Sequence, residues 1–318
     1  MTGPEKAPLA WAATVLASEV SVDRGLRGGG SPWLIRAAGH PAGVLRITPR
    51  ANAGHIRTEV AGMQHAARAG LPVPKVLGHN EGEASGFAVA LTSYMAGSSR
   101  VPVEPNRKRL RMMGATAARI SAVDVPTSAS LPPRAGPIDD VDWAALRRTR
   151  KAPAMLARAA EAVERYKPTD TRVAFVHGDL WQGNMLWEGT DVTAILDWDA
   201  SGLGSPGIDL GSVRFDAALF YGLSTVTEVL SGWEHECGRL APDVAYWDVV
   251  AALASPPNMG SVQPVMAEQG RPDLTPELLN QRREEFLRQA LRQLDVDQFA
   301  QEECKAASIA TCSVPGAR

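Results

Sequence analysis

Three oxygen-bearing side chains, closely spaced in the sequence, have the chemistry to bind a divalent cation and to move a proton. Asp179 is followed five residues later by Asn184, and a second carboxylate, Asp197, comes eighteen residues after the first. Mg²⁺ prefers oxygen ligands of this kind, and a neighbouring carboxylate can orient a hydroxyl group and accept its proton. This set meets the needs of a reaction that transfers a phosphoryl group from a nucleotide to a hydroxyl.

Two apolar runs indicate the elements that position these side chains. Residues 172–176 and 192–196 are rich in β-branched and aromatic residues, so each run predicts a short buried strand. Asp179 and Asn184 come soon after the first run, and Asp197 comes directly after the second. We therefore expect both strands to deliver polar groups into one crevice.

The motif resembles that of a known group of enzymes. His177 and Asp179, followed by Asn184 and then by an apolar strand that ends in Asp197, are similar to the catalytic loop and metal-binding aspartate of protein kinases and of the aminoglycoside phosphotransferase and choline kinase family. The second group is favoured, because Gly178 stands where a protein kinase carries Arg and no Phe-Gly follows Asp197. Protein substrates are therefore not expected.

The resemblance implies a role for each residue of the motif. Asp179 would be the catalytic base, and Asn184 and Asp197 would be the magnesium ligands. His177 would brace the catalytic loop, and Asp209 would anchor that loop through hydrogen bonds. The implied co-substrate is ATP or GTP, bound together with Mg²⁺.

The resemblance also implies a fold. We expect an α+β, bilobal, protein-kinase-like architecture with a small antiparallel β-sheet and one helix in the N-terminal lobe and a mainly helical C-terminal lobe. Residues 1–97 would bind the nucleotide, with a hinge at about 92–97, and residues 98–305 would carry the catalytic and acceptor-binding groups. Residues 306–318 have no periodicity and would form a loose tail. Helical spacing is predicted over 107–123, 143–166, 211–221, 225–240, 242–254 and 276–299.

A glycine run near the N-terminus is a candidate phosphate-binding turn. The pattern over residues 21–47 predicts three strands joined by turns, and Gly28, Gly29, Gly30 and Ser31 form the first turn. Glycine lets backbone N–H groups approach phosphates closely. The alternative is an ordinary hairpin tip, and the basic strand that follows favours the phosphate-binding role.

Four further residues are assigned to the nucleotide by the resemblance. Arg46, in the third expected strand, would contact the phosphates and pair with Glu59 on a helix predicted over 56–69. A guanidinium group is always charged and binds phosphate well, although a surface ion pair of small energetic value is the alternative. Backbone groups of Ser93 and Met95, at the expected hinge, would pair with the nucleotide base.

The acceptor is less well defined than the reaction. An aminoglycoside, macrolide or basic peptide antibiotic is the leading class, which would make the protein a resistance enzyme. A metabolic acceptor such as choline, homoserine or a sugar is the rival, and a kinase-like protein that binds a ligand without catalysis stays open. Acids that would meet a cationic acceptor, if they are not solvated helix residues, are Asp199, Asp216, Glu234 and Glu236. Asp199 is also a candidate for holding a second metal ion.

Composition and charge exclude several classes of partner. The 318 residues are 45% hydrophobic and have a net charge of −2, so general attraction to nucleic acid or to an anionic membrane is not expected. Residues 1–97 carry nine basic and six acidic residues, whereas the rest carry 24 and 29, an asymmetry that suits a cationic acceptor or reflects ordinary surface variation. The three cysteines show no paired framework and no metal spacing, and no signal peptide is indicated, so we expect a cytoplasmic location. The expected assembly state is a monomer or weak dimer.

Overall fold

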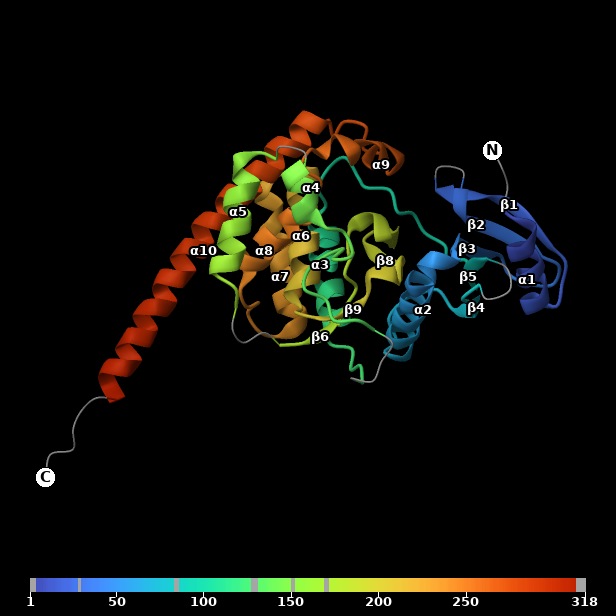
Figure 1. Cartoon of the computed structure of the whole chain (residues 1–318), viewed down its shortest axis with the longest axis horizontal. Coiled ribbons are helices and arrows are strands. Elements are labelled where there is room, and N and C mark those ends of the chain that lie inside the picture. Colours follow the sequence, from blue (N-terminus) through green and yellow to red (C-terminus); the bar gives the residue numbers. More distant parts are fainter. Residues whose placement is uncertain are drawn as a thin grey trace, which may run out of the picture.

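The computed structural model describes residues 4–27, 30–82, 86–126, 131–149, 152–168 and 172–312, with side chains up to residue 295. It has the expected bilobal α+β fold, with an antiparallel sheet in the N-terminal lobe and a helical C-terminal lobe (Figure 1). Within the described ranges, no helix is long and apolar enough to cross a membrane.

The N-terminal lobe is built on a five-stranded sheet with the strand order β1-β2-β3-β5-β4, in which every neighbouring pair is antiparallel. Its strands are β1 Val20–Arg27, β2 Gly30–Ala37, β3 Gly43–Pro49, β4 Val76–Asn80 and β5 Phe87–Ser93. The first three confirm the strand pattern predicted over 21–47. A helix that was not predicted, α1 (Lys6–Leu16), covers one face of the sheet, where Ala12 packs with Ile35 and Leu45.

Helix α2 (Ala53–Arg68) covers the other face and corresponds to the helix predicted over 56–69. Ile56 and Val60 pack against two alanines of β5. Met63 and Ala66, one and two turns further on, belong instead to a core cluster of the C-terminal lobe. Because its two faces serve different cores, α2 lies between the sheet and the helical lobe (Figure 1).

The C-terminal lobe packs its helices around α6, which is buried along almost its whole length. Its helices are α3 Arg107–Ser121, α4 Trp143–Thr149, α5 Ala154–Arg165, α6 Gly207–Tyr221, α7 Val226–Cys237, α8 Val244–Leu253, α9 Gln263–Glu268 and α10 Pro276–Cys312. A buried ion pair joins α6 to α8, since Nε and Nη2 of Arg214 each donate to an oxygen of Asp248 at 2.8 Å. The helices predicted from spacing are confirmed with shifted ends, and α9 was not predicted.

The prediction of a loose tail from residue 306 is wrong for residues 306–312, because α10 continues to Cys312. Figure 1 shows the second half of α10 extending beyond the other helices. Alanine, glutamate and glutamine, which favour helices, are frequent in residues 297–312 and sustain the helix without amphipathic periodicity. Residues 313–318 lie outside the described residues.

Two short, two-stranded antiparallel sheets position the motif residues. β6 (Ala174–Val176) pairs with β9 (Gly202–Gly204), and β7 (Met185–Glu188) pairs with β8 (Asp191–Ile195). β6 and β8 confirm the strands predicted at 172–176 and 192–196, whereas β7 and β9 were not predicted. Each predicted strand therefore has a partner of its own, and the motif residues lie in the connections that leave these pairs.

Candidate active site

A buried carboxylate in the first turn of α6 holds the loop that follows β6. The two oxygens of Asp209 accept hydrogen bonds from the backbone N–H groups of His177, at 2.7 Å, and Gly178, at 2.9 Å. Burial raises the pKa of Asp209 to about 6, against the effect of these two hydrogen bonds. The contact expected between Asp209 and the loop is therefore present, and the positive end of the α6 dipole favours a carboxylate there.

His177 links the two segments that carry the candidate catalytic groups. Its Nε2 lies 2.9 Å from the carbonyl oxygen of Leu196, and its Nδ1 accepts a hydrogen bond from the backbone N–H of Asp179 at 3.3 Å. Only the neutral tautomer with the proton on Nε2 satisfies both contacts. Burial lowers the pKa of His177 to about 4, which is consistent with a neutral ring.

Gly178 allows the tight path of the chain between His177 and Asp179. Its φ of +81° lies in the left-handed region, which favours glycine. A Cβ atom at this position would overlap the backbone carbonyl of Ala200. The Arg of a protein kinase therefore cannot replace Gly178 in this loop without a change in its path.

Asn184 connects Asp179 with the segment that contains Asp197. Its Nδ2 donates to the backbone oxygen of Asp179 at 2.9 Å and to the Oδ2 of the same residue at 3.1 Å. The backbone carbonyl oxygen of Asn184 accepts a hydrogen bond from the N–H of Leu196 at 2.8 Å. Asp197 follows directly and has a φ of +65°. The structure thus brings the three residues of the motif together.

Asp179 lies close to two other carboxylates. Burial first, and then the charges of Asp197 and Asp199, raise the pKa of Asp179 well above the ordinary carboxyl range. The hydrogen bond from Asn184 and the charge of Arg27 act in the opposite direction. A carboxylate with a raised pKa is a stronger base for a hydroxyl proton.

Arg46 binds three carboxylates at once. Its Nη1 donates to Glu59 at 3.0 Å and to Asp197 at 2.5 Å, and its Nη2 donates to Asp199 at 2.7 Å. Burial raises the pKa of Glu59 to about 7 against the charge of Arg46, and its second carboxylate oxygen is buried and has no hydrogen-bond partner among the described residues. The expected contact between Arg46 and Glu59 is present, and Asp199 faces this guanidinium group.

Sequence reasoning missed Arg27, the last residue of β1. Its Nη2 donates to Oδ1 of Asn184 at 3.1 Å, and its Nη1 lies 3.3 Å from Oδ2 of Asp197. Although burial opposes the effect, Arg46 and then Arg27 lower the pKa of Asp197. A basic residue directly before a glycine run was the available signal, but only the fold shows that it reaches the motif.

The candidates of the glycine turn lie partly outside the described residues and partly within β2. Gly28 and Gly29 lie outside the described residues, and Gly30 begins β2 opposite Arg27. The hydroxyl of Ser31 accepts from the N–H of Ile47 at 3.1 Å and donates to its carbonyl oxygen at 3.3 Å, so it ties β2 to β3.

The two hinge residues, Ser93 and Met95, differ in whether the backbone N–H group already makes a hydrogen bond. That of Ser93 donates to the carbonyl oxygen of Lys75 at 2.8 Å, so this group is already engaged within the sheet. In the part of the chain that the structure describes, the backbone of Met95 makes no hydrogen bond to other backbone groups. The N–H of Met95 is thus the better placed of the two for a base.

Three of the four acids considered for the acceptor lie elsewhere. Asp216 is buried in α6, where it accepts from the N–H of Gln182 at 3.0 Å and burial raises its pKa to about 8. On α7, Glu234 accepts from the N–H of Ala241, and Glu236 pairs with an arginine of α3. Helical spacing did not reveal which acids face inward. Within the described ranges, no hydrogen bond or ion pair joins these three acids to Asp179, Asn184 or Asp197.

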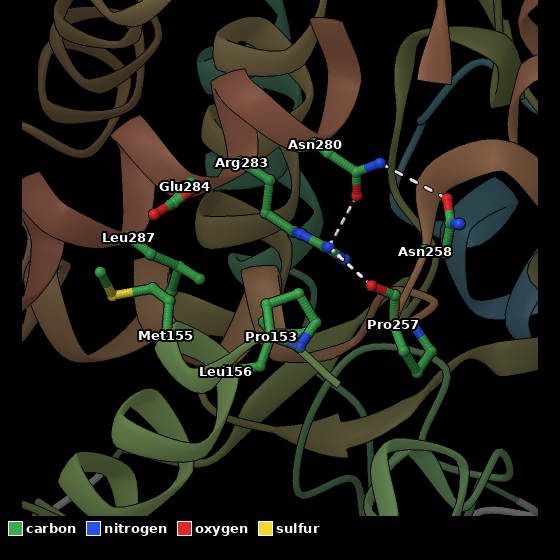
Figure 2. Close-up of a pocket in the computed structure, with 9 residues that line it drawn as sticks. All are labelled: Pro153, Met155, Leu156, Pro257, Asn258, Asn280, Arg283, Glu284 and Leu287. Atoms are coloured by element: carbon green, nitrogen blue, oxygen red, sulfur yellow. Dashed lines mark hydrogen bonds between the residues drawn. The ribbon is translucent and has the colours of Figure 1, made fainter. Parts of the chain in front are cut away.

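Two cavities differ in their relation to this site. One of about 460 Å³ borders Asp199 and is lined by Gly54, His55, Arg57, Thr58, Leu131, Pro132, Arg134 and Asp140. Another, of about 270 Å³, lies between α5 and α10 and contains none of the predicted site residues (Figure 2). There the buried Arg283 donates to the carbonyl oxygen of Pro257 and to the side chain of Asn280, both at 2.9 Å. Arg283 thus braces the N-terminal part of α10.

Comparisons with known proteins agree with the fold and the motif. The structure is similar to a putative aminoglycoside phosphotransferase from Ralstonia eutropha JMP134, with a TM-score of 0.60, 17% identity, and coverage of 92% of this chain and 98% of that one. It is also similar to the macrolide 2'-phosphotransferase MphH from Brachybacterium faecium, with a TM-score of 0.56, 19% identity, and coverage of 87% and 98%.

A third similar structure is a thermostable mutant of the aminoglycoside phosphotransferase APH(4)-Ia in a ternary complex with AMP-PNP and hygromycin B, with a TM-score of 0.59, 16% identity, and coverage of 89% of this chain and 98% of that one. A sequence comparison with curated proteins found no match. The model of the phosphotransferase enzyme family matches residues 24–253, which include the whole candidate site. The chain is therefore a member of the phosphotransferase enzyme family.

Proposed function

We propose that the protein is a Mg²⁺-dependent O-phosphotransferase that moves the γ-phosphate of ATP or GTP to a hydroxyl group of a small molecule. Membership of the phosphotransferase family supports the reaction class. The observation that carries the proposal is the contact network that joins Asp179, Asn184 and Asp197 and presents Arg46 beside them. Each group required for phosphoryl transfer is then within reach of one site.

The residues fit a magnesium ion. Oδ1 of Asn184 and Oδ2 of Asp197 both point to one cationic group, the guanidinium of Arg27, so these two oxygens can share a cation. In the described residues, no group of three or more acidic, histidine or cysteine side chains forms a metal cage. Magnesium commonly binds through one or two protein carboxylates together with phosphates and water. Bound there, it would neutralise charge on the phosphates of the nucleotide.

The side chains of this chain would divide the remaining work. Asp179 would orient the acceptor hydroxyl and accept its proton, and Asn184 would hold the carboxylate of Asp179 through its amide nitrogen. Arg46, fixed by Glu59, would present positive charge to the phosphates. Because the transition state of phosphoryl transfer is loose, positioning and charge contribute more than basicity.

An antibiotic is the acceptor class that we favour. Several solved structures with this fold are named as aminoglycoside or macrolide phosphotransferases, and one holds hygromycin B. The net charge of +3 in residues 1–97 and of −5 in the rest suits a cationic acceptor. A metabolic acceptor such as choline, homoserine or a sugar is the alternative outcome of the test.

The test is a nucleotide-consumption screen with ATP and with GTP over antibiotics and common metabolites, followed by mass measurement of the product. We expect one acceptor to gain one phosphoryl group. The Asp179→Ala variant should lower kcat by about 10³-fold, because it removes the general base, while nucleotide affinity is kept. Asp191→Ala, which removes an exposed acid at the start of β8, is the matched control. Near-normal turnover in Asp179→Ala would overturn the assignment.

A further inference from the structure

Arg27 holds the two oxygens that the proposed function gives to the cation. Its Nη2 donates to Oδ1 of Asn184 at 3.1 Å, and its Nη1 lies 3.3 Å from Oδ2 of Asp197. The remaining polar atoms of both partners have other contacts. Nδ2 of Asn184 binds Asp179, and Oδ1 of Asp197 binds Arg46. Arg27 and a metal ion would therefore need the same pair of atoms.

The two arginines of the site are held very differently. Arg46 has three acidic partners, and its side chain is 29% exposed. Arg27 has a 49% exposed side chain, and within the described residues Asn184 and Asp197 are its side-chain partners. The Arg27 side chain is the more exposed member of its pair with Asp197, and Asp197 keeps its contact with Arg46 when Arg27 leaves, so moving Arg27 costs less than moving Arg46. Arg46 is a fixed part of the site, whereas Arg27 is an exchangeable one.

We propose that Arg27 is an internal competitor for the divalent cation, occupying the oxygens of Asn184 and Asp197 when no nucleotide is bound and leaving them when the cation enters. The inference rests on the proposed function, because it uses the same two ligands. The guanidinium neutralises Asp197 in the nucleotide-free protein. A free cation must displace it, which weakens metal binding in the absence of nucleotide.

Nucleotide and cation then bind in a coupled manner. A cation that arrives on a triphosphate brings several negative charges, which offer Arg27 new anionic partners beside the old ones. Displacement of Arg27 is therefore less costly for the metal–nucleotide complex than for the free ion. By linkage, each ligand strengthens the binding of the other.

The test is a titration of the nucleotide-free protein with Mn²⁺, with free Mn²⁺ measured by electron paramagnetic resonance. Arg27→Gln should bind Mn²⁺ about fivefold more tightly than the wild type, since it removes a half-exposed competing charge. The matched control is Arg24→Gln on the same strand, whose side chain is 57% exposed and pairs with Asp23. This control should leave Mn²⁺ affinity unchanged. Thermal unfolding by circular dichroism verifies that each variant is folded.

Two results would overturn the inference. One is measurable Mn²⁺ binding by the wild type that is equal or weaker in folded Arg27→Gln. The other is tight Mn²⁺ binding that survives in the R27Q/D197N double variant, because the metal would then bind elsewhere. Failure of the proposed function looks different, since neither wild type nor Arg27→Gln would bind Mn²⁺ in the presence or absence of ATP or GTP.

Discussion

His177 is a buried residue whose protonation would break its contact with the backbone N–H of Asp179. Nδ1 accepts a hydrogen bond from the N–H of Asp179, and the positive ring would have a donor there instead. Its pKa is lowered to about 4 by burial, so the folded protein resists protonation while the unfolded chain takes up a proton near the ordinary pKa of histidine, about 6.5. Stability from the neutral ring is therefore present above pH 6.5 and is lost as the pH falls toward 4.

We predict that this histidine alone lowers the free energy of unfolding by about 2 kcal/mol between pH 7 and pH 5. Urea unfolding of the wild type and of His177→Gln at both values of pH measures the contribution, because the stability of the variant should fall less over this interval. His79→Gln, which removes an exposed histidine of β4, is the control. Equal pH dependence in wild type and His177→Gln would contradict the neutral ring.

The residues of the motif were predictable because their chemistry is local in the sequence. Asp179, Asn184 and Asp197 follow a fixed spacing, and the structure joins them through hydrogen bonds. Arg27 was not predictable in this way, because its contact with Asn184 spans 157 positions and depends on how β1 faces the other lobe. The orientation of Asp216 was also hidden, since α6 is buried on all sides and has no polar face to reveal it.

At the scale of elements, the connection between β6 and η2 (Gln182–Asn184) depends on backbone space more than on side chains. Gly178 combines a φ of +81° with a close approach to Ala200, whereas Gly189, in the turn between β7 and β8, has a φ of +61° and open space around it. Alanine substitutions at these two glycines therefore distinguish the cost of backbone strain, which both would have, from the cost of steric overlap, which only Gly178 would have.

Gly178→Ala should lower the free energy of unfolding by about 3 kcal/mol, because left-handed strain and overlap with Ala200 add up. Gly189→Ala should cost about 1 kcal/mol, because the left-handed strain acts alone. Chemical denaturation of both variants measures the difference. Only Gly178→Ala should also lower kcat, since it displaces Asp179. Similar losses of stability in the two variants would show that the contact with Ala200 relaxes freely.

The locations of strands and helices in the sequence were predicted better than the elements against which they pair or pack. Amphipathic spacing and β-branched runs located β1 to β3, α2, α3 and most later helices, because burial of one face leaves a period in the sequence. β9 was not predicted, because Gly202–Gly204 contains two glycines and no strand-forming pattern. Its position beside β6 depends on the turn that follows Asp197. α1 was not predicted, because it is a short apolar helix that is stabilised by packing on the sheet.

For the whole molecule, α2 joins two cores that the sequence alone would assign to separate lobes. Ile56 and Val60 serve the sheet, while Met63 and Ala66 pack in the core that contains Phe175 and Trp198. The hydroxyl of Ser201 also donates to the carbonyl oxygen of Thr58, at 3.4 Å. The boundary predicted near residue 97 therefore does not separate two independent cores, because packing through α2 is continuous across it.

We predict that residues 1–97 do not form a stable domain when they are expressed alone. The isolated fragment would expose Met63 and Ala66, which are 2% and 0% exposed in the whole chain, and it would lose the acidic partners of Arg46 at Asp197 and Asp199. Thermal unfolding monitored by circular dichroism should show no cooperative transition, or the fragment should aggregate. The full chain under the same conditions is the control. A sharp, reversible transition in the fragment would contradict the shared core.

The shared position of α2 also constrains recombination between relatives of this protein. α2 lies between β3 and β4 in the sequence, so no single crossover can take the whole sheet from one parent and leave α2 with the helical lobe of the other. A chimera joined near residue 97 would combine one parent's Met63 face with the other parent's Phe175 and Trp198. Families built on this arrangement are thus expected to exchange acceptor specificity by substitutions and loop changes within the helical lobe more readily than by exchange of whole lobes.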